Sequence, residues 1–212
     1  MIKQMITASL LLTLYSIIGT GLVAYTSAAT KDQITANEKG VLVNGIGEVL
    51  SADRYDNDIT SDKITLTDPA KLGTPNPVTI YRARKGDTPV AAVITTEAPE
   101  GYSGAIKLLI SINIDGTLAG VRVISHAETP GLGDKVETSK SDWILKFAGK
   151  SLNDPKPDSW GVKKDGGVFD QFSGATITPR AIVKSIKTTL VYFQDNSGEI
   201  FSKPSDTVKD KS

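Results

Sequence analysis

Residues 170–179 read Asp170-Gln171-Phe172-Ser173-Gly174-Ala175-Thr176-Ile177-Thr178-Pro179, a short polar stretch that leads directly into a periodic apolar segment. Over residues 180–193 the apolar side chains recur at helical spacing, at Ile182, Val183, Ile186, Leu190 and Phe193. Thr178 is a suitable N-cap, and Pro179 suits the first helical turn, where a missing N–H group costs nothing. We therefore predict a helix that begins at this turn and packs one face on the core.

This turn allows two interpretations. In the first, it is only a glycine turn followed by a helix cap. In the second, Ser173 to Thr176 form a site for an anion, because they lie just ahead of a helix N-terminus. Free N–H groups and the helix dipole favour an anion such as a phosphate there. The choice between the two depends on the rest of the chain.

The amino-acid composition limits the kinds of cofactor and catalysis that the chain can support. The 212 residues are 39% hydrophobic and carry no net charge, so the chain can bury one core and gives no sign of a nucleic-acid partner. There is no cysteine, and His126 is the single histidine. These counts exclude disulfides, cysteine-ligated iron–sulfur clusters, thiol catalysis, thiolate-rich zinc sites and a two-histidine haem. We predict no metal site, and any redox chemistry must use an organic cofactor.

The N-terminal segment has the length of a membrane span. An uncharged run from Met5 to Thr30 has an apolar centre from Ile6 to Tyr25, which is long enough to cross a hydrocarbon core as a helix. Lys3 and Lys31 flank it almost evenly, so charge gives little information on orientation. Small residues at 26–29 leave signal-peptide cleavage as an alternative, but a signal peptide usually has a shorter apolar core, of about 7–15 residues. We predict a retained anchor with a cytoplasmic N-terminus and the bulk of the chain exported.

Residues 27–77 are predicted to form a connector and the first part of the exported region. Three glycines among residues 37–49 argue against a helix there. Residues 52–68 are charged and irregular, and prolines at 69, 75 and 77 indicate a loop. We therefore place the start of the domain core at residue 78.

Apolar and polar residues alternate from residue 78 onward, as in half-buried strands. Asp115-Gly116 between two such segments is a strong hairpin signal. The predicted strands cover residues 78–82, 89–96, 105–114 and 117–125. The fold class is therefore α+β, an antiparallel meander with flanking helices, preceded by one transmembrane helix. Residues 139–149 are predicted to be a short amphipathic helix, and residues 195–212 a polar tail.

A polar loop follows the last predicted strand, at residues 126–133. His126 and Glu128 could be an acid–base pair of a hydrolase, but no nucleophile motif and no third, orienting group accompany them. The other interpretation is a histidine that is hydrogen-bonded within a structured loop. We predict no catalytic acid or base.

Three motifs in this order carry a family resemblance. They are Gly101-Tyr102-Ser103-Gly104, His126-x-Glu128-Thr129-Pro130-Gly131-Leu132-Gly133 and Asp170-x-x-Ser173-Gly174-Ala175-Thr176. Their order and spacing resemble the FMN-binding domain family. The phrases around them, such as Val162-Lys163-Lys164-Asp165-Gly166-Gly167, resemble more closely the G subunit of the Rnf complex, also called the ion-translocating oxidoreductase complex. The resemblance covers the chain from the N-terminal anchor to about Tyr192.

The resemblance implies a covalent FMN, joined through its phosphate to Thr176 by a flavin transferase. It implies that the transferase recognises Asp170, Ser173, Gly174, Ala175 and Thr176. The last four of these residues would also hold the cofactor, and the loop of Glu128, Thr129 and Leu132 would line the flavin ring. No other residue is assigned a site by the resemblance.

The resemblance also implies an electron carrier among the other subunits of a membrane-bound Rnf-type complex. Such a complex couples electron transfer between ferredoxin and NAD to ion translocation. The implied arrangement places residues 1–4 in the cytoplasm, an anchor at 5–26 in the bacterial inner membrane, and the rest in the periplasm. Residues 78–194 would form the FMN-binding domain. We expect no independent substrate turnover.

Two other functions are considered. A membrane-tethered binding or assembly module would use the same fold without flavin. A flavin reductase that acts on a small organic acceptor would need a further domain, for which anchor, connector and flavin domain leave no room. The presence or absence of a covalent flavin separates the first of these from the electron carrier.

Overall fold

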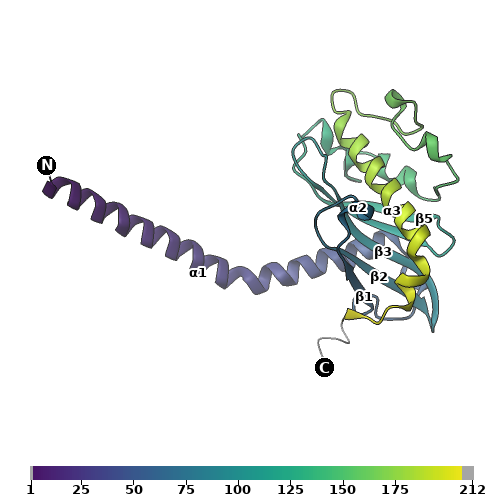
Figure 1. The fold of residues 1–212 in the computed structure, drawn as a ribbon, viewed down its shortest axis with the longest axis horizontal. Helices are drawn as coiled ribbons and strands as arrows, with labels where there is room; N and C mark the ends of the chain where they lie inside the picture. Colours follow the sequence, from purple (N-terminus) through teal and green to yellow (C-terminus); the bar gives the residue numbers. More distant parts are fainter. Residues whose placement is uncertain (1, 207–212) are drawn as a thin grey trace. The chain divides into compact units, whose positions relative to one another are not determined.

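The computed structural model describes residues 2–206, and the chain divides into two compact units, Met1–Leu42 and Val43–Ser212. Helix α1 runs from Ile2 to Val49 (Figure 1), and the first unit contains the part of it up to Leu42. Its 30 residues from Ile2 to Lys31 have a mean hydropathy of 1.8, and none of this apolar segment is buried in the structure. At 1.5 Å per residue they extend about 45 Å, more than the hydrocarbon thickness of a bilayer. The predicted apolar helix of membrane-spanning length is confirmed.

Helix α1 does not end at the glycine-rich segment, so the prediction of an irregular connector at residues 37–49 was wrong. The reason is burial of the last helical turns within the second unit, where Ile46 and Val49 are almost fully buried. Gly45 allows a close approach to the sheet, because a Cβ there would lie 3.2 Å from Leu109 Cδ2. Packing of an apolar face outweighs the low helix propensity of glycine.

The second unit is built on a five-stranded antiparallel sheet with the order β1-β2-β3-β4-β5. The strands are β1 (Lys63–Leu66), β2 (Val78–Lys85), β3 (Thr88–Ala98), β4 (Ile106–Asn113) and β5 (Leu118–Ser125). The α+β class and the antiparallel meander are confirmed. Strand β1 was missed because it is short and lies in the segment that we expected to be irregular. It is held by pairing with β2, which is not a local signal.

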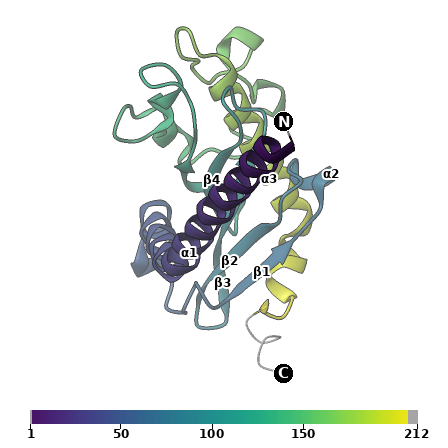
Figure 2. The ribbon, with the colours of Figure 1, turned by 90° about the vertical axis from the view of Figure 1, so that its left-hand side faces the viewer.

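Helix α3 (Ile177–Ser202) runs along one face of the sheet (Figures 1 and 2). The predicted apolar side of this helix is buried, and so are the strand residues that share its core, including Val78, Ile80, Ile94, Leu108 and Ile110. The opposite face of the sheet is covered by the last turns of α1, where Val49 meets Gly120 and Gly45 meets Leu109. Because β4 is buried on both faces, its sequence is a nearly continuous apolar run.

Helix α3 continues to Ser202, well beyond Phe193, so the prediction of a polar tail directly after that residue was wrong. Ile200 is almost fully buried, which the polar composition around it had concealed. The buried guanidinium of Arg82 donates a hydrogen bond to the carbonyl of Ile200 at 3.0 Å and also binds Asp62. These contacts fix the end of α3 on the sheet. Residues 207–212 lie outside the described part of the chain.

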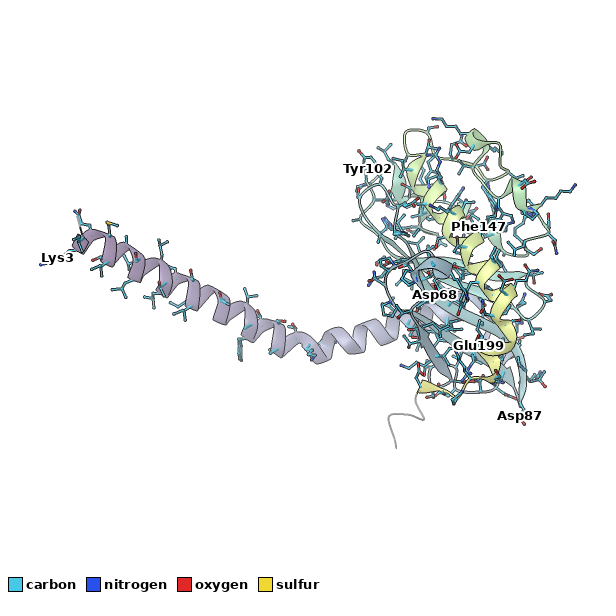
Figure 3. The ribbon with its side chains drawn as sticks, viewed as in Figure 1. Lys3, Asp68, Asp87, Tyr102, Phe147 and Glu199 are labelled. Atoms are coloured by element: carbon cyan, nitrogen blue, oxygen red, sulfur yellow. The ribbon has the colours of Figure 1, made fainter. Side chains whose placement is uncertain are left out.

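The remaining elements are short. They are α2 (Pro69–Leu72), η1 (Ala52–Arg54), η2 (Gly133–Val136), η3 (Trp143–Phe147), η4 (Pro157–Ser159) and η5 (Lys163–Asp165). The helix expected over residues 139–149 is therefore only the 3-10 helix η3, although Trp143, Ile144 and Phe147 are buried as predicted. The first turns of α3 lie among the loops of residues 126–172, beyond one end of the sheet (Figure 1). Figure 3 shows Tyr102 at this end and Asp87 at the other.

Candidate functional site

The turn before α3 is tight and exposed. The N–H of Ala175 donates to the carbonyl of Phe172 at 3.1 Å, which closes the turn around Ser173 and Gly174. Gly174 has a φ of +81°, a conformation that residues with a Cβ rarely adopt. The turn therefore presents Ser173 and Gly174 to solvent and leads the chain into α3.

Thr176 is the N-cap of α3, so the prediction that Thr178 is the cap was wrong. The Thr176 carbonyl accepts a hydrogen bond from the N–H of Arg180 at 3.3 Å, while its half-buried side chain makes no capping bond. Thr178 lies in the first turn of α3, is fully buried, and donates its hydroxyl hydrogen bond to Glu128. Of these two hydroxyl groups, that of Thr178 is engaged in the core and that of Thr176 is not bound to its helix.

Asp170 is held on both its side chain and its backbone. Its carboxylate accepts hydrogen bonds from Lys163 Nζ at 2.5 Å and from Lys146 Nζ at 3.3 Å. These bonds, that from Lys163 first, hold the pKa of Asp170 below its ordinary value. Its carbonyl accepts a hydrogen bond from Trp143 Nε1 at 2.7 Å. The start of the turn is thus fixed to residues that come before it in the chain.

An aromatic cluster supports the same turn from inside. The rings of Trp143 and Phe172 are in edge contact, with centroids 5.2 Å apart. Phe147 stacks on Phe169 with centroids at 4.5 Å, and Trp160 lies against both. Sequence reasoning missed this cluster, because its rings come from several short segments without a common periodicity. It holds the residues on either side of Asp170.

The second predicted loop, at residues 128–133, lies against this turn. The N–H groups of Leu132 and Gly133 both donate to the carbonyl of Thr129, at 3.1 and 3.0 Å. The Leu132 side chain is 42% exposed, and its Cδ2 atom would lie 3.3 Å from a Cβ at Gly174. The structure thus brings together two of the stretches that the sequence singled out.

Glu128 connects this loop to the Gly101–Gly104 motif and to the first turn of α3, which follows the third motif. Its side chain is buried, with a residue exposure of 4%. Oε1 accepts a hydrogen bond from the N–H of Ser103 at 3.0 Å, and Oε2 accepts one from the hydroxyl of Thr178. The first two motifs and the helix turn that directly follows the third therefore meet at one carboxylate, which nothing in the sequence alone indicated.

His126 is hydrogen-bonded within the loop, as the second interpretation expected. Its Nδ1 atom accepts from the N–H of Glu128 at 3.1 Å, and Nε2 lies 2.9 Å from Glu137 Oε1. Because Nδ1 is an acceptor, this network assigns the ring proton to Nε2, which donates to Glu137. The Glu128 carboxylate is bound to Ser103 and Thr178, and not to the imidazole. This arrangement does not form an acid–base pair.

The surroundings of Thr176 fit a group with a phosphate and a flat apolar ring. The hydroxyl stands at the first turn of a 26-residue helix, where a negative charge is favoured. Apolar side chains near it are exposed, namely Ile177 at 44% and Leu132 at 42%, and Tyr102 in the Glu128-bound loop is 67% exposed. Among the described residues no group of His, Cys, Asp and Glu could hold a metal ion.

Comparisons with known proteins agree with this geometry. Residues 101–191 match the FMN-binding domain family, and residues 1–49 match the RnfG N-terminal region. The class of protein is therefore an FMN-binding domain that follows an apolar N-terminal helix. The first match contains all three motifs, including Glu128 and Thr176.

Full-length relatives define the family. The chain is 47% identical over 201 residues to the G subunit of the ion-translocating oxidoreductase complex of Pseudoalteromonas atlantica, a span of 94% of each chain. The protein of the same name from Vibrio atlanticus is 47% identical over 92% of this chain and 93% of its own. That from Shewanella baltica is 44% identical over 95% of each. The chain belongs to the family of G subunits of the ion-translocating oxidoreductase complex.

Proposed function

We propose that the protein is the electron-carrying subunit of a membrane-bound Rnf-type complex, and that it carries FMN as a covalent phosphodiester on Thr176. The observation that carries this proposal is the position of the Thr176 hydroxyl. It stands at the start of α3, within the Asp-x-x-Ser-Gly-Ala-Thr motif, with no bond to its own helix. In the complex, electrons would pass between ferredoxin and NAD with coupled ion translocation.

Thr176 is a better acceptor than the hydroxyl groups beside it. Thr178 donates its hydroxyl to a buried carboxylate and is fully buried, so no enzyme can reach it. Ser173 lies in the exposed turn three residues before the N-cap, whereas Thr176 is the N-cap itself, where the helix N-terminus best stabilises a phosphodiester charge. Gly174 and Ala175 add little bulk beside Thr176, which leaves room for a transferase.

Attachment forms one bond and breaks one. The Thr176 oxygen bonds to the phosphorus of a flavin whose phosphate is activated as a pyrophosphate, as in flavin adenine dinucleotide. The bond from that phosphorus to the adenosine phosphate breaks, AMP leaves, and the hydroxyl proton passes to a base of the flavin transferase. The protein gains the mass of FMN less water. Asp170, Ser173, Gly174 and Ala175, with Thr176, form the surface that the transferase recognises.

When bound, FMN supplies the one- and two-electron chemistry, and the protein supplies binding and orientation. Ser173, Gly174 and Ala175 hold the phosphate end. Leu132 and Thr129, both exposed, line the ring with the loop that Glu128 anchors. The covalent tether gives a high effective concentration of flavin outside the cytoplasm and allows the ring to stay open to redox partners.

We base the proposed membrane topology on the apolar N-terminal part of helix α1. Residues 1–4 lie in the cytoplasm, residues 5–26 span the inner membrane, and the remainder lies in the periplasm. The proposed FMN-binding domain at 78–194 lies within the compact unit Val43–Ser212, which also includes part of the predicted connector and the last turns of α3. The other subunits of the complex contact the domain in the periplasm. Accessibility of Lys203 and Lys31 to a membrane-impermeant amine reagent in intact cells with a permeabilised outer membrane tests the orientation.

The attachment is tested by replacing Thr176 with Ala and with Val in cells that possess the transferase. We expect both variants to fold with unchanged melting temperature and to give no flavin fluorescence on a denaturing gel. Thr189→Val, which removes an α3 hydroxyl outside the proposed site, should remain fluorescent. Fluorescence that persists on both Thr176 variants would refute the attachment site. Wild-type protein without any bound chromophore would support instead a membrane-tethered binding or assembly module.

A further inference from the structure

The buried carboxylate of Glu128 joins three segments that are far apart in the sequence. It accepts one hydrogen bond from the N–H of Ser103, 25 residues earlier, and one from the hydroxyl of Thr178, 50 residues later. Thr178 is in the first turn of α3, two residues after Thr176. The carboxylate therefore fixes the start of the helix that carries the proposed acceptor.

Two glycines allow the backbone to approach this carboxylate closely. A Cβ at Gly133 would lie 2.8 Å from Glu128 Oε2, which is closer than real Cβ contacts, and 3.0 Å from Thr178 Oγ1, which is tighter than most of them. A Cβ at Gly101 would lie 3.0 Å from Glu128 Oε1 and would overlap the carbonyl of Gly104. The backbone therefore approaches the Glu128–Thr178 pair closely from two sides, and the pair has little freedom to rearrange.

Stability alone does not account for such a group. A buried charge loses its hydration, and an apolar pair of the same volume is often as stable or more stable. Buried polar groups can instead select one arrangement among several similar ones. Here the arrangement that they select is the first turn of α3 relative to the loops of residues 101–104 and 128–133.

We propose that Glu128 and Thr178 are positioning residues for flavin attachment, and that their hydrogen bond sets the orientation in which the Thr176 hydroxyl is presented to the transferase. This inference rests on the proposed function. Neither residue touches the reacting atoms: Thr178 orients the helix turn, and Glu128 holds Thr178. Loss of the hydrogen bond should reduce the rate of the chemical step and leave the recognition motif at residues 170–176 intact.

The experiment uses full-length chain in detergent, purified from cells without the transferase. A purified flavin transferase and flavin adenine dinucleotide are added, and the initial rate of attachment is followed by in-gel fluorescence at several protein concentrations. Thr178→Val should lower kcat about tenfold or more, as for the loss of one hydrogen bond to a charged group, with the KM for the protein unchanged. Thr178→Ser, which keeps the hydroxyl, should stay within about threefold of wild type.

Two control variants separate positioning from stability. Thr189→Val removes another buried hydroxyl from α3, which bonds to the carbonyl of Ser185 at 2.8 Å. Glu97→Gln alters another buried carboxylate, which binds Thr74 and Asn76. Both should shift the melting temperature as Thr178→Val and Glu128→Gln do, without changing the attachment rate.

The inference is overturned if Thr178→Val is modified at the wild-type rate, or if Thr189→Val slows attachment as much as Thr178→Val. It is also overturned if Thr178→Ser fails to restore the rate while its melting temperature equals that of wild type. If Thr178→Val does not fold, the attachment rates of Thr178→Ser and Glu128→Gln are compared with that of Glu97→Gln. The inference is then overturned if Glu128→Gln is modified as fast as Glu97→Gln. Failure of the wild-type chain to accept flavin on Thr176 would instead reject the proposed function.

Discussion

Substitution of Gly174 by Ala tests whether the shape of the turn before α3 matters for flavin attachment. Gly174 has a φ of +81°, which costs a residue with a Cβ about 1–2 kcal/mol. The new methyl group would meet Leu132 Cδ2 at 3.3 Å, and the exposed Leu132 side chain can move away. The turn is exposed, so it can escape the strain by changing its conformation.

The expected decrease in the attachment rate follows from this relaxation of the turn. If the relaxed turn must return to its original conformation in the transferase complex, the strain is added to the barrier. About 1–2 kcal/mol then lowers the attachment rate roughly 5- to 30-fold. Global stability should change little, because the strain is released locally in the free protein.

The assay compares Gly174→Ala with Gly116→Ala. Gly116 has a φ of +84° in the β4–β5 hairpin, and a Cβ there meets nothing within 4 Å. Melting temperatures are read from tryptophan fluorescence, and attachment rates from in-gel flavin fluorescence. We expect Gly116→Ala to lower the melting temperature by about 2–4 °C per kcal/mol of strain and to leave the rate unchanged. Equal attachment rates for Gly174→Ala and wild type would refute the reasoning.

Two further predictions concern charged groups. Replacing Lys146 and Lys163 by Met should raise the carboxyl pKa of Asp170 towards 3.8 in an NMR titration, whereas Lys164→Met should not. Because the folded-state pKa of Asp170 is depressed, these ion pairs stabilise the fold above the unfolded-state pKa and lose their effect as pH falls through the folded-state pKa. An unchanged titration of Asp170 in the double variant would contradict the predicted rise in pKa. Arg82→Met should lower the free energy of unfolding in urea by about 3 kcal/mol or more, because the guanidinium is buried and holds Asp62 and the end of α3. Lys184→Met, which removes an exposed ion pair with Glu100, should cost less than about 1 kcal/mol, and equal losses for the two variants would contradict the importance of burial.

Local signals were sufficient for the centre of the fold. Alternation in residues 78–125 and the Asp115-Gly116 turn predicted β2 to β5, and the 3.6-residue period predicted the buried face of α3. Strand β1 and the last turns of α1 and α3 could not be predicted in this way. They depend on partners distant in the sequence: β2 for β1, Leu109 for the Gly45 turn, and Arg82 for the end of α3.

The candidate site, like the fold, could be predicted only in part from local signals. The order and spacing of the motifs identified Asp170, Thr176 and the loop at 128–133 as candidates. The same reasoning assigned Thr178 as a cap, because Thr before Pro at a helix start is a strong local signal. Its actual partner, Glu128, is 50 residues away, and only the folded chain brings the two together.

Mass mapping of natively expressed protein tests the central claim most directly. The full chain is purified from cells that contain the transferase, digested, and the peptide with residues 165–180 is fragmented in a mass spectrometer. We predict an added mass of FMN less water, localised to Thr176. An unmodified peptide, or the same added mass localised to Ser173 or Thr178, would contradict the account.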